Sequence, residues 1–435
     1  MKTRRSLAIL IALGLALGLP AIGFAADEIH WTFTGPTSVT VDWRGSETTV
    51  RYGPTQDLGR TAKASPPEPR PFSSKGPFQE ARISGLQENT LYYYAIGNGA
   101  QHTFRTPLPR GKSGFTFIVE GDIGNATDWS RVGACQSMIA SAKPDFVLGI
   151  GDLTYANPVG QRAVDAHFND VMVWSLDAAY MPAWGNHEWD DPKKDDLRNY
   201  KGRFDLPNPQ KSPADPRYPH TGGGEDWYWF DYGNVRFVAY PEPWRGAWED
   251  WGEKARDIMH DAEEDSAITF IVTFGHQPAF SSGYHEGEPE LQGIMGTLRK
   301  LYPKLVLNLN GHSHNYERTH PQNGVTHLTA GTGGSDLEED EEGDCLWKGG
   351  CPQPPWTAFR AMHHVVVQLH IEADRIEGTA FCGPAGSGHS NRNDILCERG
   401  TVVDSFKIYP YGVAPGALKP ESEEEEEGEH REPQH

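Results

Sequence analysis

Hydrophobic and polar positions follow two different patterns along the chain. Over residues 27–107, short segments alternate between hydrophobic and polar side chains, as at 39–43, 49–52 and 92–96. Alternation with a period of two predicts β-strands, and the Pro- and Ser-rich segment 64–75 predicts a connection between two of them. We therefore expect an all-β domain over 27–107, followed by a short linker.

From residue 115 onward the hydrophobic positions form continuous runs, which predict buried strands. Such runs occur at 115–120, 146–150, 235–240, 268–274 and 305–309, and further strand patterns occur at 364–370 and 401–408. Helical patterns lie between some of them, as at 250–262, where hydrophobic residues recur every three to four positions. This alternation predicts an α/β domain over 113–410, with its functional site at the carboxyl ends of the strands.

Residues 1–25 have the pattern of a secretory signal. Basic residues, among them Arg4 and Arg5, precede a hydrophobic run at 7–19, and small residues precede a cleavage point near Ala25. A membrane-spanning helix needs ~20 hydrophobic residues, so we expect cleavage and no membrane anchor afterwards. The two arginines also fit a twin-arginine signal, which leaves the export route open. The mature protein is predicted to be secreted or periplasmic.

The composition indicates a folded and acidic protein. Of its 435 residues, 37% are hydrophobic and 11% aromatic, which excludes a largely disordered chain. Acidic residues outnumber basic ones 60 to 39, and the formal charge of −21 argues against nucleic-acid binding. Much of the excess lies in two runs, 336–344 and 421–429. We expect the first to be a solvated acidic loop and the second to belong to a disordered tail over 411–435.

Five cysteines suit a protein of an oxidising compartment. We expect two local disulfides, Cys345–Cys351 and Cys382–Cys397, and a free Cys135 in a helix. Other pairings, or five reduced and buried thiols, stay open, because spacing alone does not fix connectivity.

Polar residues that suit metal binding follow the hydrophobic runs. They occur in five segments: Gly121-Asp122-Ile123-Gly124, Gly151-Asp152-Leu153-Thr154-Tyr155, Gly185-Asn186-His187-Glu188, Gly275-His276 and Gly311-His312-Ser313-His314. Together they offer carboxylate, phenol, amide and imidazole donors, a set that suits two cations. A single Asp or His after a strand is often a helix cap or a structural residue, but five such segments in succession favour a metal centre.

These segments resemble the signature of the calcineurin-like metallophosphoesterases (DxG, GDxxY, GNH(D/E), VxxH and GHxH), in the version of the purple acid phosphatases. One motif differs, because Thr273 replaces the usual Val. The resemblance implies a domain of two packed β-sheets flanked by α-helices. Members often carry a fibronectin type III-like sandwich before it, and residues 86–92 resemble the tyrosine corner of such a sandwich, with Trp43 in its core.

The resemblance also implies a ligand set for two metal ions. Most metallophosphoesterases have a His ligand where Gly124 stands, and Tyr155 supplies a phenolate instead, a donor suited to Fe(III). The alternative is that Tyr155 packs as an ordinary core aromatic. Carried over residue by residue, the resemblance assigns Fe(III) to Asp122, Tyr155 and His314, a divalent ion (Fe, Zn or Mn) to Asn186, His276 and His312, and the bridging position to Asp152.

Two further histidines are implied in phosphate-ester chemistry. His187 follows Asn186 and is expected to face the substrate. His285 resembles the family residue that protonates the leaving alkoxide, although a surface-loop histidine is the alternative. The resemblance thus implies an exported acid phosphatase that hydrolyses phosphate monoesters by attack of a metal-bound hydroxide.

Three alternatives stay open at this point. The same metals suit a phosphodiesterase or a nucleotide pyrophosphatase. An exported alkaline phosphatase of the phosphodiesterase-D type would need a cysteine ligand, and Cys135 lies outside the strand-end segments. The third is a non-catalytic surface-binding protein whose sandwich makes the functional contacts. The complete ligand set argues against it.

Overall fold

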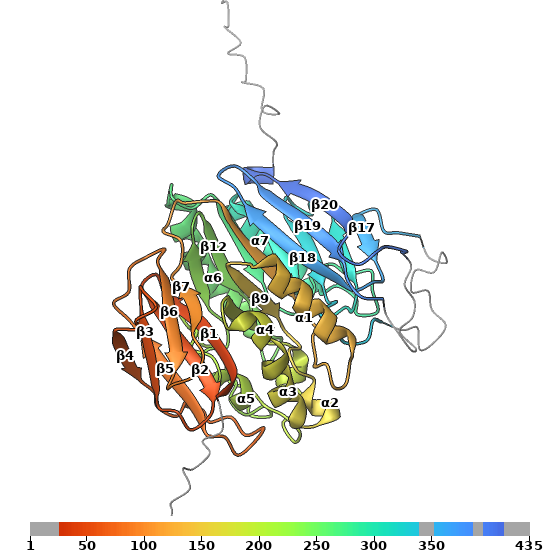
Figure 1. Cartoon of the computed structure of the whole chain (residues 1–435). Helices are drawn as coiled ribbons and strands as arrows, with labels where there is room; N and C mark the ends of the chain where they lie inside the picture. Colours follow the sequence, from red (N-terminus) through yellow and green to blue (C-terminus); the bar gives the residue numbers. More distant parts are fainter. Residues whose placement is uncertain (1–25, 339–351, 386–394, 413–435) are drawn as a thin grey trace, which may run out of the picture.

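The structure is a computed structural model that describes residues 26–338, 352–385 and 395–412. The N-terminal part, red to orange in Figure 1, consists of two antiparallel sheets. One sheet holds β1 (Asp27–Gly35), β2 (Ser38–Arg44) and β5 (Phe78–Ile83), and the other holds β4 (Arg60–Lys63), β3 (Thr49–Gly53), β6 (Leu91–Ile96) and β7 (His102–Arg105). Trp31 of the first sheet contacts Phe104 of the second, with ring centroids 5.9 Å apart.

The predicted tyrosine corner is present in this sandwich. The Tyr92 hydroxyl accepts a hydrogen bond of 3.0 Å from the backbone N–H of Gln87, and the Tyr92 ring stacks on Phe104. Trp43 is buried, as expected of a core residue. The alternating pattern of the sequence therefore produced the β-rich domain that it predicted.

The rest of the chain forms two larger sheets. The six-stranded sheet has the order β10 (Ala179–Ala183), β9 (Phe146–Ile150), β8 (Phe115–Glu120), β18 (Val365–Ile371), β19 (Ile376–Cys382), β20 (Val402–Ile408). The seven-stranded sheet has the order β11 (Trp229–Tyr232), β12 (Val235–Ala239), β13 (Phe270–Phe274), β14 (Leu305–Asn310), β16 (Thr326–Ala330), β15 (Tyr316–Thr319), β17 (Thr357–Ala361). Strands β8, β9 and β10 are parallel, and so are β12, β13, β14 and β16.

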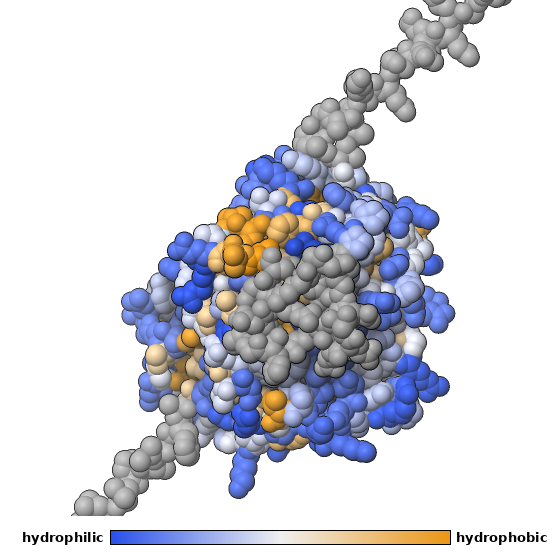
Figure 2. Space-filling view, turned by 90° about the vertical axis from the view of Figure 1, so that its right-hand side faces the viewer, coloured by the Kyte–Doolittle hydropathy of each residue, from blue (hydrophilic) through white to orange (hydrophobic). Residues whose placement is uncertain are grey.

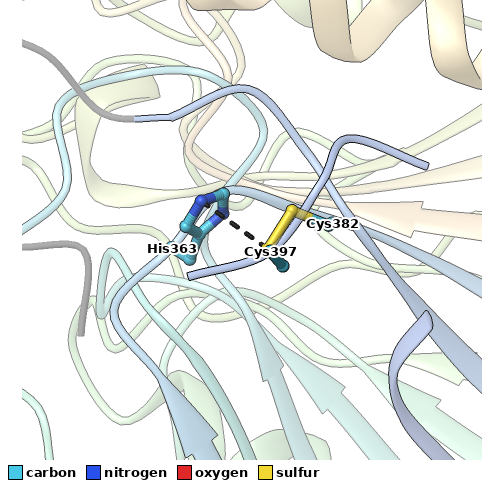
Figure 3. A group of neighbouring side chains, drawn as sticks. All are labelled: His363, Cys382 and Cys397. Atoms are coloured by element: carbon cyan, nitrogen blue, oxygen red, sulfur yellow. Dashed lines mark hydrogen bonds between the residues drawn. A yellow bond between two sulfur atoms is a disulfide. The ribbon is translucent and has the colours of Figure 1, made fainter. Parts of the chain in front are cut away.

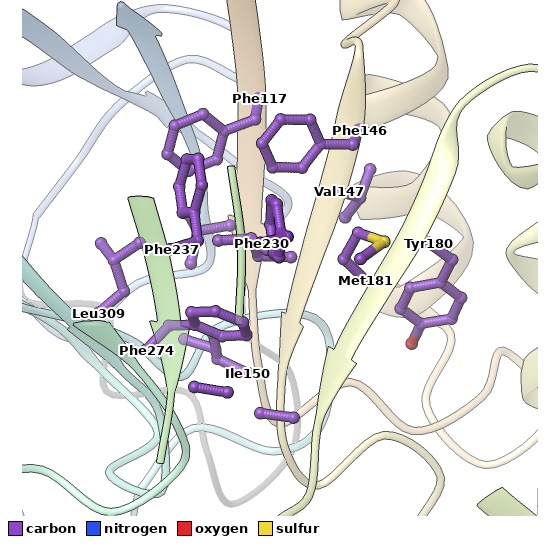
Figure 4. Close-up of a cluster of buried hydrophobic side chains, with 14 of the residues drawn as sticks. Phe117, Phe146, Val147, Ile150, Tyr180, Met181, Phe230, Phe237, Phe274 and Leu309 are labelled. Atoms are coloured by element: carbon purple, nitrogen blue, oxygen red, sulfur yellow. The ribbon is translucent and has the colours of Figure 1, made fainter. Parts of the chain in front are cut away.

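The two large sheets pack against each other through aromatic side chains (Figure 4). The rings of Phe117 and Phe146 are stacked 5.0 Å apart on one sheet. Both meet the ring of Phe237, on the other sheet, edge to face at 5.2 and 5.5 Å. Such pairs add to the stability that burial of the rings provides. The continuous hydrophobic runs are therefore strands buried between layers.

Helices cover the outer faces of the six- and seven-stranded sheets (Figure 1). They are α1 (Arg131–Ala142), α2 (Ala156–Val159), α3 (Arg162–Asp170), α4 (Met172–Ser175), α5 (Arg198–Lys201), α6 (Ala247–Glu264) and α7 (Pro289–Leu301), with the 3-10 helices η1 (Asn186–Glu188) and η3 (Pro410–Gly412). Helix α1 contacts β18 of the six-stranded sheet. In α6, Trp251 donates a hydrogen bond to the carbonyl of Ala239 on β12, so this helix lies on the seven-stranded sheet. The predicted fold class is confirmed.

The N-terminal sandwich packs directly on the six- and seven-stranded layers. Phe33 of β1 contacts Phe230 and Phe146, with ring centroids 5.1 and 5.8 Å apart. The Tyr94 hydroxyl also donates a hydrogen bond of 2.9 Å to the carbonyl of Leu176, in the second domain. The aromatic segment around Phe230 is therefore part of the core and of the domain interface.

One predicted disulfide is confirmed. Cys382 and Cys397 are joined, and the imidazole of His363 lies beside them (Figure 3). Cys135 is free and buried in α1, as expected. His363, Cys382 and Cys397 also have the spacing of a metal site, but both sulfur atoms are bonded to each other in the disulfide.

Other predictions fall wholly or partly outside the described residues. The pair Cys345–Cys351, the signal over 1–25, and positions 339–344 and 413–435 lie there. The prediction of a solvated loop over 336–344 is wrong for Leu337 and Glu338, which are 2% and 6% exposed. Leu337 packs against Met362, and Glu338 accepts hydrogen bonds from loops of the site described below.

In the view of Figure 2 much of the visible surface is hydrophilic, with a hydrophobic area above the grey atoms and smaller ones elsewhere. Within the described ranges, no helix has the length and hydropathy needed to cross a bilayer. A groove between α1 and the strands β18 and β19 is lined by hydrophobic side chains, among them Met138, Val366 and Phe381.

Candidate metal centre

The carboxyl ends of the parallel strands bring the predicted ligands together. Asp122 follows β8, Asp152 follows β9, and Asn186 follows β10. His276 follows β13, and the segment of His312 follows β14 on the other sheet. Because parallel strands end at one edge of a sheet, loops far apart in sequence meet there.

The first group of donor atoms consists of Asp122, Tyr155, His314 and Asp152. The Tyr155 hydroxyl lies 2.8 Å from His314 Nε2 and 3.2 Å from Asp122 Oδ1. His314 Nε2 lies 3.2 Å from the same Asp122 oxygen. Ligand atoms of Asp122, Asp152 and His314 all lie within 4.8 Å of one another. This is the set that the sequence predicted for the first ion.

The second group consists of Asp152, Asn186, His276 and His312. His276 Nε2 lies 3.1 Å from Asp152 Oδ2, 3.2 Å from Asn186 Oδ1 and 3.2 Å from His312 Nδ1. Asp152 therefore belongs to both groups, in the position expected of a bridging carboxylate. All seven predicted ligands are brought together.

Backbone conformation at this edge is unusual. Four predicted ligands have positive φ: Asp122 at 57°, Asp152 at 50°, Tyr155 at 55° and His312 at 69°. Left-handed conformations cost a non-glycine residue roughly 1–2 kcal/mol each, and such residues concentrate at functional sites. The fold thus carries strain where the donors converge.

Two glycines let the loops approach. A Cβ on Gly185 would collide with Asp152 Oδ1, so only a residue without a side chain fits beside that carboxylate. Gly124 has φ of +79°, and a Cβ there would lie 2.5 Å from the Trp129 ring. Trp129 contacts Tyr155, with ring centroids 5.3 Å apart. The Trp129 ring therefore fills the space that a side chain at position 124 would need.

Hydrogen bonds orient the donors. His276 Nδ1 lies 3.0 Å from the carbonyl of Ile150, and His314 Nδ1 lies 2.5 Å from that of Asp336. A ring N–H that donates to a carbonyl leaves the other nitrogen as the lone-pair donor, which is the usual arrangement at metal-binding histidines. Both Nε2 atoms point into the cluster.

Glu188 holds two strand-end loops together. Its carboxylate accepts backbone N–H groups of Gly185, Asp152 and Leu153 at 2.7, 2.8 and 2.9 Å. Sequence reasoning assigned Glu188 no role, although it stands in the same motif as Asn186. Glu338 was missed as well, because its contacts depend on loops distant in sequence.

The electrostatics of the cluster favour a cation. Burial opposes a charged imidazole, yet the carboxylates of Asp152 and Asp122 hold the pKa of His276 well above its usual value. Similarly, burial is outweighed by Asp122 and Glu338, which raise the pKa of His314 to about 9. Burial and Asp122 raise the pKa of the Tyr155 phenol well above 10. Ionising that phenol therefore requires strong positive charge close by.

The donor set fits two metal ions. Each group offers four donors, and the carboxylate of Asp152 is shared between them. The buried carboxylates need positive charge nearby, which protonated histidines provide when no metal ion is bound. Tyr155, Asp122 and His314 make a hard, anionic group, while Asn186, His276 and His312 make a neutral, nitrogen-rich one.

Both additional histidines lie at the cluster. The backbone N–H of His187 donates to Asp152 Oδ1 at 2.9 Å. The centroids of the His187 and Tyr155 rings are 4.4 Å apart, and the His187 side chain is 28% exposed. The His285 ring stacks on His312, with centroids 3.9 Å apart. His285 is partly exposed. Burial lowers the pKa of His285 below the ordinary histidine value. The alternative of an isolated surface histidine is not supported.

Two family models match the chain. One, described as calcineurin-like phosphoesterase, covers residues 115–316, and the other, described as the N-terminal domain of purple acid phosphatases, covers residues 26–107. The boundary between the two matches falls in the linker predicted after residue 107.

Curated relatives carry related names. "Purple acid phosphatase 21" of Arabidopsis thaliana is 26% identical over 78% of this chain and 76% of its own length. "Probable inactive purple acid phosphatase 1" of the same plant is 26% identical over 80% of this chain, which spans only 64% of that relative. "Nucleotide pyrophosphatase/phosphodiesterase" of Hordeum vulgare is 28% identical over 71% of this chain and 87% of its own.

Solved structures have the same fold. Purple acid phosphatase PPD1 from yellow lupin (Lupinus luteus) seeds matches with a TM-score of 0.64 and 21% identity, over 88% of this chain and 74% of that one. PhoD matches with a TM-score of 0.60 and 13% identity, over 88% and 90%. At these identities the likeness establishes the fold alone.

Proposed function

The chain belongs to the purple acid phosphatase family of the calcineurin-like metallophosphoesterases, and on that basis we propose that it hydrolyses phosphate monoesters at acidic pH. The observation that carries the proposal is the complete ligand set, since all seven predicted donors converge around Asp152. A relative that had lost activity by losing its metals would be expected to lack some of these donors.

The proposed metals are Fe(III) at Asp122, Tyr155 and His314, and Fe(II), Zn(II) or Mn(II) at Asn186, His276 and His312. When bound, such a pair supplies Lewis acidity and lowers the pKa of coordinated water, most strongly at the trivalent ion. That is the physical basis for activity at low pH. The net negative charge of the chain is no obstacle, because the positive field at the site is local.

The chain's own residues divide the remaining work. Asp152 holds both donor groups at a fixed separation, and Glu188 holds the loops that carry it. His187 and His285 flank the donors from opposite groups, next to Tyr155 and His312 respectively. His285 is proposed to donate a proton to the departing alkoxide oxygen, so that water and ester yield phosphate and alcohol.

A second candidate keeps the metals and changes the substrate. One relative is named a nucleotide pyrophosphatase/phosphodiesterase, which favours a diester or pyrophosphate bond as the alternative. A phosphodiesterase-D type of alkaline phosphatase is less favoured, because Cys135 is buried in α1 and is absent from the donor groups found in the described residues. We also propose export to the periplasm or the exterior, on the pattern of residues 1–25.

The test is a comparison of rates on 4-nitrophenyl phosphate and bis(4-nitrophenyl) phosphate, with metal content measured on the same sample. We expect the monoester to be hydrolysed faster at acidic pH. Faster hydrolysis of the diester would move the assignment to the alternative. Protein that contains two metal ions and is inactive on every ester and pyrophosphate would contradict both.

The role of His285 has its own test. The change His285→Ala should lower turnover of alkyl phosphates, whose leaving groups need a proton, by roughly 10²-fold or more. Nitrophenyl phosphate should be much less affected. Equal losses on both substrates would remove the proposed acid role.

A further inference from the structure

The first residues of the acidic run 336–344 are built into the metal centre. The Ser335 hydroxyl donates a hydrogen bond of 2.7 Å to the carbonyl of Asp122. The Asp336 carbonyl accepts from His314 Nδ1. Leu337 and Glu338 are buried. The chain therefore returns to the site after β16 and covers the loop of His314.

The carboxylate of Glu338 joins two loops of this site. Its Oε1 accepts the backbone N–H of His314 at 3.0 Å. Its Oε2 accepts the backbone N–H of Tyr284 at 2.7 Å and the side-chain amide of Asn315 at 3.4 Å. Three donors thus point at one carboxylate, an arrangement that only an acceptor-only group satisfies.

The loop held in this way carries His285. A Cβ on Gly283 would collide with Asn315 Nδ2 and would lie 2.7 Å from Glu338 Oε2, so the backbone approaches the bridge as closely as it can. One residue after the bonded N–H of Tyr284, the carbonyl of His285 accepts the Ser313 hydroxyl at 3.1 Å. The His285 ring then stacks on His312.

We propose that Glu338 is a positioning residue, which fixes the loop of His285 against the metal-ligand loop of His312 and His314. The proposal rests on the proposed function for its kinetic part and on the geometry alone for its structural part. The nearly isosteric change Glu338→Gln keeps the packing but directs a side-chain amide N–H at a backbone N–H. Its effect should therefore come from the altered position of the loop that carries His285.

Amide hydrogen exchange tests the placement without reference to activity. In Glu338→Gln, exchange should be about tenfold faster than in the wild type, both at 281–288 and at 312–315. Glu317 provides a matched comparison, since it accepts the N–H and the hydroxyl of Ser282, both at 2.7 Å. Glu317 also accepts the Thr357 hydroxyl at 2.7 Å. Of the two segments, Glu317→Gln should therefore accelerate exchange at 281–288 and not at 312–315. Glu286→Gln removes an exposed charge from the same loop and should change neither segment.

Kinetics of the metal-loaded protein test the consequence. Glu338→Gln should lower kcat on an alkyl phosphate about tenfold more than on 4-nitrophenyl phosphate, with the two metal ions retained. Unchanged exchange in both segments would overturn the proposal, and so would equal losses on the two substrates. If the wild type hydrolyses no ester, the proposed function fails, and the exchange result alone decides the role of Glu338.

Discussion

Two buried clusters of acidic side chains lie in this molecule, and their partners differ. At the domain interface, Arg203 pairs with Glu28 at 2.9 Å and with Asp165 at 3.0 Å, and Arg44 pairs with Asp165 at 2.5 Å. At the strand ends, the ion pairs that Asp122 and Asp152 form within the described residues are all with histidines.

The difference separates a structural cluster from a functional one. Arginine keeps its charge at every pH that proteins tolerate, so the interface carries its own permanent counter-charge. A histidine can release its proton and then act as a neutral metal ligand, so the strand-end carboxylates are matched to a cation from outside. Burial alone does not distinguish the two clusters. The identity of the partner does.

The largest effect is expected where the external cation is needed. Asp152→Asn removes the shared charge and should lower metal affinity and activity by more than about 100-fold. Glu28→Gln, an equal loss of charge at the interface, should leave metal content and turnover within about twofold. Metal analysis and assays of both variants decide the comparison, and full metal content in Asp152→Asn would contradict the shared-carboxylate assignment.

The converse change should damage stability. Arg203→Met leaves Glu28 buried without one of its partners, and removing one member of a buried pair costs about 3–5 kcal/mol of unfolding free energy. Turnover per folded molecule should stay near that of the wild type. Denaturant unfolding measures the loss, and the double variant with Glu28→Gln should recover part of it. Equal stability of the single and double variants would mean that the pair is not coupled.

A smaller effect is expected from the pH dependence of the sandwich. Asp42 is buried, neither of its carboxylate oxygens has a hydrogen-bond partner among the described residues, and it faces Glu80, Asp205, Glu225 and Arg82. Burial, with the three acids, raises its pKa well above 3.8, so the folded state binds a proton that the unfolded state releases. Stability is then greatest below that ordinary value and falls as the pH rises toward the raised pKa, by about 1.4 kcal/mol for each pH unit that separates the two pKa values.

The variant Asp42→Asn does not titrate, so its unfolding free energy should fall less between pH 5 and pH 8 than that of the wild type. Parallel curves for the two proteins would show that Asp42 does not control this dependence.

Sequence patterns located the candidate ligands because each one lies a few residues after the end of a strand. A buried strand leaves a continuous hydrophobic run, and the residues just after it fall at the sheet edge, so Asp122 and His276 can be placed without knowledge of the topology. Glu188 stands in the same motif as Asn186 and could have been found there. The bridge from Glu338 to Tyr284 spans 54 residues, and the pair of Arg203 and Glu28 spans 175, and neither leaves a local pattern.

The same limit explains the error over the acidic run. Seven acids in nine positions predict solvation by composition, but Glu338 faces three N–H donors that other segments supply. A carboxylate with such partners is buried at little cost, because its hydrogen bonds replace those to water.

The visible absorption spectrum of the oxidised protein tests our proposal that Tyr155 and its neighbours hold Fe(III). Iron content is measured on the same sample. We expect a broad charge-transfer band from the Tyr155 phenolate to Fe(III), which disappears in Tyr155→Phe while His314 and Asp122 still retain iron. A colourless protein with two zinc or manganese ions and no iron would contradict it.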